Sequence, residues 1–333
     1  MRIGIVTQPL FNNYGGVLQN YALQTILKRM GHDPITIDCI PQNSIVRWLV
    51  STVRSLLFFP FRRFRRPFAP FPKPRLRDAR FNAFVDRYLV TTPLMYRFPK
   101  RLVERFELDA VIVGSDQVWR PKYNPFLTDS FLAFASKTKI CRIAYAASFG
   151  VDNWEYSLIQ TRICRRLAQK FDAISVREES GVNLCKQFLG VNAVHVLDPT
   201  FLLSSEDYEQ LLDTSRPEHP PYLAAYILDD NEEKRGYIQR EADLRGLAVR
   251  FFSAGKNASL RIEDWLAIFF DSSFVVTDSF HGTVFSIIFG KEFICLANKE
   301  RGNARIDSLL RLNNQNRIDA LRQTSIRFLS ENL

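Results

Sequence analysis

The chain has 333 residues, of which 46% are hydrophobic and 24% are charged, so it is long and apolar enough for two globular domains and is not a disordered protein. The opening residues lack the features of a signal peptide, and no run of about 18 apolar residues follows, so we expect a cytoplasmic protein without a membrane-spanning helix. The net charge is +10, but residues 54–80 alone hold nine basic residues against one acidic residue, so the rest of the chain is nearly neutral.

Short apolar runs alternate with longer amphipathic runs along most of the chain, a pattern typical of βαβ units and parallel sheets. The predicted strands are residues 3–7, 35–40, 110–114, 143–147, 173–176, 194–197, 222–228, 248–252, 274–277 and 293–296. The predicted helices are residues 17–30, 154–169, 179–189, 232–245, 262–270 and 283–289. Ten strands are many for one sheet, so we predict an α/β fold with two Rossmann-like domains, residues 1–197 and 198–333.

One segment, residues 55–80, departs from this alternation because it is dense in Phe, Arg and Pro, and its five prolines oppose a regular helix. We predict an insertion in the N-terminal domain. One hypothesis is that it docks on an anionic membrane, where basic residues are attracted and phenylalanines can insert. A solvated loop is the alternative. We expect no nucleic-acid partner, because no recognition fold accompanies the patch.

In a parallel α/β sheet, ligands bind beyond the carboxyl ends of the strands, and four predicted strand ends carry polar residues. The first strand is followed by Asn12, Asn13, Tyr14, Gly15 and Gly16. Asparagine tolerates turn conformations, and glycine allows a ligand to approach the backbone closely. The segment does not match G-x-G-x-x-G, so a dinucleotide site is poorly supported, and an ordinary loop is the alternative.

The next two strand ends deliver Ser115, Asp116 and Gln117, and then Arg177. Asp116 could act on a ligand or simply cap a turn. Arg177 suits a phosphate or carboxylate, because its guanidinium is planar and donates in two places. The structural alternative for Arg177 is an ion pair with a neighbouring glutamate, Glu178 or Glu179.

The fourth strand end, Thr277-Asp278-Ser279-Phe280-His281-Gly282, is the most specific. Asp278 or Ser279 can cap the following helix, whose free N–H groups then form an anion site. His281 is one of only four histidines, and its place at a strand end favours a catalytic role. No metal site is predicted, because the five cysteines are scattered without a C-x-x-C pair.

These strand ends resemble the polysaccharide pyruvyl transferase family. The resemblance rests on Asn-Asn-Tyr-Gly-Gly, Gly-Ser-Asp-Gln-Val-Trp, Ser-Val-Arg-Glu-x-Ser and Ser-Phe-His-Gly, which occur in the family's order. It implies a fold similar to GT-B glycosyltransferases, with two Rossmann-like domains facing across a cleft. It also implies transfer of pyruvate from phosphoenolpyruvate, as a co-substrate, onto two hydroxyls of a sugar in a bacterial surface polysaccharide or its lipid-linked precursor. No cofactor is implied.

The resemblance also suggests roles for individual residues, with His281 and Asp116 as the catalytic pair. The expected donor-binding residues are Arg177, Ser279, Phe280, His281, Gly282, Arg301 and Arg305. Some family members have Arg in place of Phe280, and Arg301 and Arg305 are plausible substitutes for that cation. The expected acceptor-binding residues are Asn12, Asn13, Tyr14, Gly15, Gly16, Ser115 and Gln117.

The two-domain prediction has a geometric consequence. Arg177 and a partly exposed His281 should face each other across the cleft, on the order of 5–12 Å apart. Two other functions remain open: a nucleotide-sugar glycosyltransferase of the same architecture, and a non-catalytic glycan- or membrane-binding protein.

Overall fold

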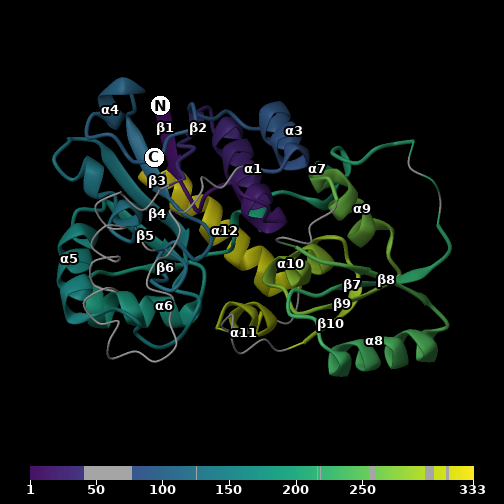
Figure 1. Ribbon diagram of the computed structural model, residues 1–333. Helices are drawn as coiled ribbons and strands as arrows, with labels where there is room; N and C mark the ends of the chain where they lie inside the picture. Colours follow the sequence, from purple (N-terminus) through teal and green to yellow (C-terminus); the bar gives the residue numbers. More distant parts are fainter. Residues whose placement is uncertain are drawn as a thin grey trace, which may run out of the picture.

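Six parallel strands form the first sheet, in the order β2-β1-β3-β4-β5-β6 (Figure 1). The computed structural model describes residues 1–40, 77–124, 126–215, 217, 219–254, 260–296, 304–312 and 315–333. The strands are β1 (Arg2–Val6), β2 (Asp33–Thr36), β3 (Ala110–Val113), β4 (Cys141–Ala147), β5 (Ala173–Val176) and β6 (Val194–His195). Apolar runs such as Ala-Val-Ile-Val in β3 are fully buried because helices cover both faces of such a sheet.

The helices of this half are α1 (Tyr14–Arg29), α3 (Ala79–Tyr88), α4 (Leu102–Arg105), α5 (Leu158–Ala168) and α6 (Glu179–Leu184). A π-helical turn, Cys185–Leu189, extends α6. α5 lies on the side of the first sheet that faces away from the second sheet (Figure 1).

The second sheet has four parallel strands in the order β10-β9-β7-β8. They are β7 (Tyr222–Tyr226), β8 (Ala248–Phe252), β9 (Phe274–Thr277) and β10 (Glu292–Cys295). The remaining helices are α7 (Ser205–Glu209), α8 (Glu232–Arg245), α9 (Ile262–Asp271), α10 (Phe280–Ile288), α11 (Ala304–Leu310) and α12 (Gln315–Asn332). Within the described residues, no helix is both long and apolar enough to cross a membrane.

The last helix, α12, returns to the first sheet (Figure 1). Its Phe328 ring lies 6.2 Å from that of Tyr145 in β4, and its Ser325 hydroxyl accepts the backbone N–H of Leu197 at 2.9 Å. The predicted boundary between residues 197 and 198 falls between β6 and β7. Packing of α12 nevertheless ties the end of the chain to the first half.

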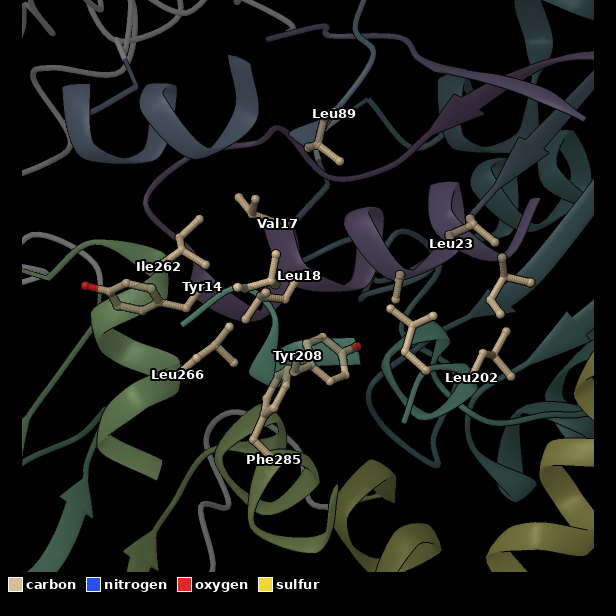
Figure 2. Close-up of a cluster of buried hydrophobic side chains, with 14 of the residues drawn as sticks. Tyr14, Val17, Leu18, Leu23, Leu89, Leu202, Tyr208, Ile262, Leu266 and Phe285 are labelled. Carbon is tan, nitrogen blue, oxygen red and sulfur yellow. The ribbon is translucent and has the colours of Figure 1, made fainter. Parts of the chain in front are cut away.

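A shared apolar cluster joins the two halves (Figure 2). The Tyr14 ring, at the start of α1, stacks on Trp265 of α9 with centroids 5.3 Å apart, and both side chains are fully buried. The Tyr208 ring of α7 meets Phe285 of α10 edge-on at 4.9 Å. Large aromatic side chains contribute much of the burial energy of such contacts. This cluster therefore fixes the start of α1 against α9 and α10.

All ten predicted strands are present, with ends that shift by a few residues. Two helices begin three residues earlier than predicted, α1 at Tyr14 and α10 at Phe280. The residues before the predicted starts include glycines, which we interpreted as loop. The first turn of a helix accepts glycine when a neighbouring group needs the space that a side chain would fill.

The predicted insertion is shorter at its C-terminal end than expected. Residues 55–76 lie outside the described residues, but Arg77, Asp78 and Arg80 belong to the folded domain. Arg77 pairs with Asp38 at 2.6 Å, and Asp78 caps α3 by accepting the backbone N–H of Arg80 at 3.0 Å. The Arg80 side chain also pairs with Asp78, at 2.8 Å. These two arginines are therefore occupied within the protein.

Candidate functional site

A cavity of about 440 Å³ opens between the carboxyl ends of the two sheets, as the strand-end rule predicts. Its lining from the first half consists of Gln8, Pro9, Phe11, Asn12, Asn13, Gly15, Asp116, Gln117 and Tyr123. Its lining from the second half consists of Tyr226, Leu228, Ala254, Asp278, Ser279, Phe280, His281, Arg305 and Ile306. In the part of the chain that the structure describes, no group of three or more His, Cys, Asp or Glu residues could hold a metal ion.

Asp116 reaches the cavity through an unusual backbone path after β3. Gly114 has φ +138°, and a Cβ there would lie 1.9 Å from the carbonyl oxygen of Tyr145, so only glycine fits. Asp116 follows in the left-handed region at φ 70°. Its Oδ1 accepts the N–H of Gln117 at 2.8 Å, and its Oδ2 accepts the amide of Asn13 at 3.3 Å. The carboxylate is therefore fixed in place rather than serving as a simple helix cap.

Arg177 lies behind Asp116 and does not line this cavity. Its side chain is 1% exposed, with Nη2 3.5 Å from Asp116 Oδ1 and Nη1 2.5 Å from Asp198 Oδ2. The glutamate partners considered from the sequence are engaged elsewhere: Glu178 accepts the N–H of Gly150 at 3.1 Å, and Glu179 lies 3.6 Å from Arg311. A ligand in the cavity would therefore contact Asp116 before it could reach the guanidinium of Arg177.

Asp198 is the residue that sequence reasoning missed. Its Oδ2 accepts bonds from Arg177 Nη1 at 2.5 Å and the Ser115 hydroxyl at 2.9 Å, while its Oδ1 accepts the Thr200 hydroxyl at 2.7 Å. Burial alone would raise its pKa, but Arg177 and the other donors hold the pKa at about 2. The signal was available, because Asp198 also follows a predicted strand.

His281 stands in the first turn of α10, with Ser279 as N-cap accepting the N–H of Gly282 at 3.4 Å. Its Nε2 lies 3.9 Å from Asp198 Oδ2, the oxygen that Arg177 also contacts, so the two side chains lie within one small ligand's length. His281 is 7% exposed, and the prediction that it is partly exposed was wrong. Burial lowers its pKa to about 4, although Asp198 acts in the opposite direction. The imidazole is therefore neutral at neutral pH.

Gly15 has a different role from the one suggested by sequence. A Cβ at this position would lie 2.0 Å from His281 Nδ1, far inside contact distance. The missing side chain admits the imidazole of His281 from the other half of the molecule. Gly15 lines the cavity, but the His281 ring fills the space that a side chain at this position would need.

Arg305 is the cation that faces the cavity. The residue is 7% exposed, its Nε has no hydrogen-bond partner, and no acidic residue within the described ranges pairs with it. Its guanidinium carbon lies 5.3 Å from the centre of the Phe280 ring, and that of Arg177 lies 4.5 Å from the same centre. Burial, with the nearby charge of Arg177, lowers the pKa of Arg305 to about 10. An unpaired buried cation is expensive unless a ligand supplies the counter-charge.

The other predicted site residues divide into two groups. Asn12, Asn13 and Gln117 line the cavity, as do Ser279 and Phe280. Four others are held by the protein itself and do not line it: Tyr14 donates to the Leu260 carbonyl, Gly16 faces the Asn13 side chain, Ser115 donates to Asp198, and Gly282 packs against Thr277. Arg301 lies outside the described residues.

Comparisons with known proteins agree with this architecture. Among solved structures, the UDP-GlcNAc 2-epimerase from Neisseria meningitidis bound to UDP-GlcNAc is similar, with a TM-score of 0.50 and 10% identity over 99% of both chains. A putative UDP-N-acetylglucosamine 2-epimerase from Listeria monocytogenes has a TM-score of 0.48 and 12% identity over 97% of this chain and 90% of that one. A glycosyltransferase from Rickettsia africae has a TM-score of 0.44 and 9% identity over 99% and 94%.

The likeness to the Neisseria meningitidis structure concerns the fold alone, and it confirms the predicted α/β architecture, which is like that of GT-B enzymes. A comparison with curated protein sequences found no match. A model of the polysaccharide pyruvyl transferase family matches residues 13–300, a range that includes the Asn13, Asp116, Arg177 and His281 segments. The chain therefore belongs to the polysaccharide pyruvyl transferase family.

Proposed function

We propose that the protein transfers a pyruvyl group from phosphoenolpyruvate to two hydroxyls of a sugar, forming a ketal and releasing phosphate. The observation that carries this proposal is that one cavity holds the guanidinium of Arg305, which has no ion pair among the described residues, together with the neutral imidazole of His281. The first group can hold an anion, and the second can accept a proton.

The proposed donor fits the charges of the cavity. Phosphoenolpyruvate carries a phosphate and a carboxylate, and a guanidinium can grip either group in two places. The first turn of α10, capped by Ser279, adds the positive end of a helix next to Arg305. Binding of this anion would supply the counter-charge that Arg305 lacks.

The proton balance of the reaction suits a neutral histidine. The first sugar hydroxyl adds to C2 of the donor, and a proton is added to its methylene carbon, which becomes a methyl group. The second hydroxyl then displaces phosphate, which leaves with the remaining proton. His281 starts unprotonated, so it can take a proton from the attacking hydroxyl and deliver it to the methylene carbon. The donor's negative charge would stabilise the imidazolium formed in between.

Asp116 and the amide side chains of the first half would receive the acceptor. Asp116 is ionised, because the charges of Arg177 and Arg305 outweigh the effect of burial and lower its pKa. A carboxylate and the amides of Asn12, Asn13 and Gln117 provide acceptors and donors for sugar hydroxyls on one side of the cavity. Asp116 is the second candidate for proton transfer.

Thermal stabilisation of the purified full chain is the first test. Phosphoenolpyruvate should raise the melting temperature, while pyruvate and inorganic phosphate at equal concentration should raise it less. The Arg305→Gln variant should lose most of the shift, and Arg311→Gln, which changes an exposed arginine just after α11, should keep it. Stabilisation by UDP-sugars and not by phosphoenolpyruvate would instead favour a glycosyltransferase. Phosphate release that requires both donor and a sugar acceptor then tests the reaction.

A further inference from the structure

Helix α5 presents an exposed surface of mixed apolar and basic character, made by Leu158, Ile159, Arg162, Ile163 and Arg166 and termed the α5 surface. Leu158 is 90% exposed, Ile159 is 74% exposed and Ile163 is 42% exposed. Exposed single apolar residues are common in soluble proteins, but three together on one turn and a half of helix indicate a contact surface.

The basic residues lie among the apolar ones. Arg162 and Arg166 are exposed. Steps of four residues link Leu158 to both arginines and Ile159 to Ile163, so the members share one face of the helix. Neither arginine has an ion-pair partner among the described residues. The surface therefore offers aliphatic side chains for insertion and free positive charge for attraction, the combination found in helices that lie on anionic membranes.

The position of the α5 surface relates it to the cavity. In a βαβ unit the helix begins at the edge of the sheet where the preceding strand ends, which is the edge that carries the cavity. A chain of contacts connects the two: Arg120 donates to the Gln117 side chain at 3.2 Å and pairs with Glu155 at 3.1 Å, just before Ser157 caps α5. Leu158 and Ile159 occupy the first turn of α5, the end nearer the cavity.

We propose that the α5 surface docks on an anionic lipid bilayer. The charge of the surface favours this occupant over a neutral apolar partner, because each arginine near an anionic leaflet adds attraction that falls with salt. None of its members belongs to residues 55–76, and its role does not depend on the reaction in the cavity.

Vesicle flotation with the full chain tests the proposal. The wild type should bind vesicles that contain phosphatidylglycerol, bind phosphatidylcholine vesicles weakly, and dissociate from the former at high salt. The Leu158→Ser/Ile159→Ser and Arg162→Glu/Arg166→Glu variants should each lose binding by about tenfold or more. Leu244→Ser is the matched control, because Leu244 of α8 is 80% exposed in the other half of the molecule, and it should bind like the wild type.

Three results would overturn the proposal. The first is equal binding of the wild type to neutral and anionic vesicles, or binding to neither. The second is unchanged binding of both double variants, which would place the contact elsewhere in the chain. The third is a wild-type protein that sediments as a dimer and a Leu158→Ser/Ile159→Ser variant that sediments as a monomer. That result would make the surface a contact between copies of the chain. Phosphate release with a soluble acceptor should be unchanged in the α5 variants, so failure of the docking proposal and failure of the proposed reaction are distinguishable.

Discussion

Behind the first wall of the cavity, at the ends of β3, β5 and β6, Arg177 lies between two carboxylates, Asp116 and Asp198, and pairs with both. In the second wall, formed by the starts of α10 and α11, two groups lack a hydrogen-bonded partner of opposite charge among the described residues. Arg305 has no ion pair there, and His281 Nε2 is buried without a hydrogen bond. The first wall therefore has the features of a scaffold, and the second wall holds groups that a ligand would satisfy.

Burial has opposite consequences for the two arginines, Arg177 and Arg305. Burial of Arg177 is compensated by the carboxylates of Asp116 and Asp198. Removal of the guanidinium would leave these two carboxylates without their cation. Burial of Arg305 lowers its pKa despite the attraction of Asp116, and no described residue forms an ion pair with it. Arg305 therefore costs stability in the free protein and becomes useful when an anion binds. Groups that break a local rule of stability are the ones expected at functional sites. The following variants test this contrast, beginning with the largest expected effect.

Arg177→Met should destabilise the fold by about 3–5 kcal/mol, because it leaves the buried carboxylate of Asp198 without its cation. The free energy of unfolding in urea measures the loss. Arg29→Met is the matched control. Arg29 pairs with Asp207 at 2.5 Å, but its side chain is 51% exposed. The loss of this surface ion pair should cost about 1 kcal/mol or less. Equal costs for the two variants would contradict the scaffold role of the first wall.

His281→Gln should lower turnover by about 100-fold or more, the usual scale for losing a general acid or base. The melting temperature should stay close to that of the wild type. His195→Gln is the control, because His195 is half-buried beside Ser308 and does not line the cavity. If turnover survives in His281→Gln, the histidine only positions the anion, and Asp116 becomes the first candidate for proton transfer.

Arg305→Gln should raise the KM for phosphoenolpyruvate by about 10-fold, the scale of a lost hydrogen bond to a charged group. Its free energy of unfolding should be unchanged or higher, opposite in sign to the effect of Arg177→Met. Steady-state kinetics and urea unfolding on the same preparation give both values. If the Arg305→Gln protein were destabilised but bound phosphoenolpyruvate normally, Arg305 would have a structural role and no role in donor binding.

The sheets could be predicted from the sequence because their strands are continuous apolar runs separated by amphipathic helices. Several helices were not predicted, among them α3, α11 and α12. Their packing depends on distant partners, as shown by Phe328 of α12 against Tyr145 of β4. Contacts between residues far apart in the chain leave no local pattern.

The strand-end rule located most of the cavity, including Asp116, Ser279 and His281. It could not show that Arg177 is buried behind Asp116, because the depth of a side chain depends on what lies in front of it. Nor could it show why Gly15 is required, since the ring that occupies its missing side chain comes from the other half of the molecule. Asp198 followed from the same rule and was overlooked.

The smallest expected effect concerns the pH dependence of stability. The pKa of His281 is lowered by burial from its ordinary 6.5 to about 4 in the folded protein, so between these values the unfolded chain binds the extra proton. Stability contributed by the neutral imidazole is complete above about pH 6.5 and is lost as the pH falls toward 4. Between pH 7 and pH 5.5 the loss should be on the order of 1 kcal/mol.

In His281→Gln this part of the pH dependence should vanish, so its unfolding free energy should fall less on acidification than that of the wild type. His219→Gln, which changes an exposed histidine, should follow the wild-type curve. Identical pH dependence in the wild type and His281→Gln would mean that the imidazole is not held neutral by burial, and the second wall would then lack the feature on which proton acceptance by His281 depends.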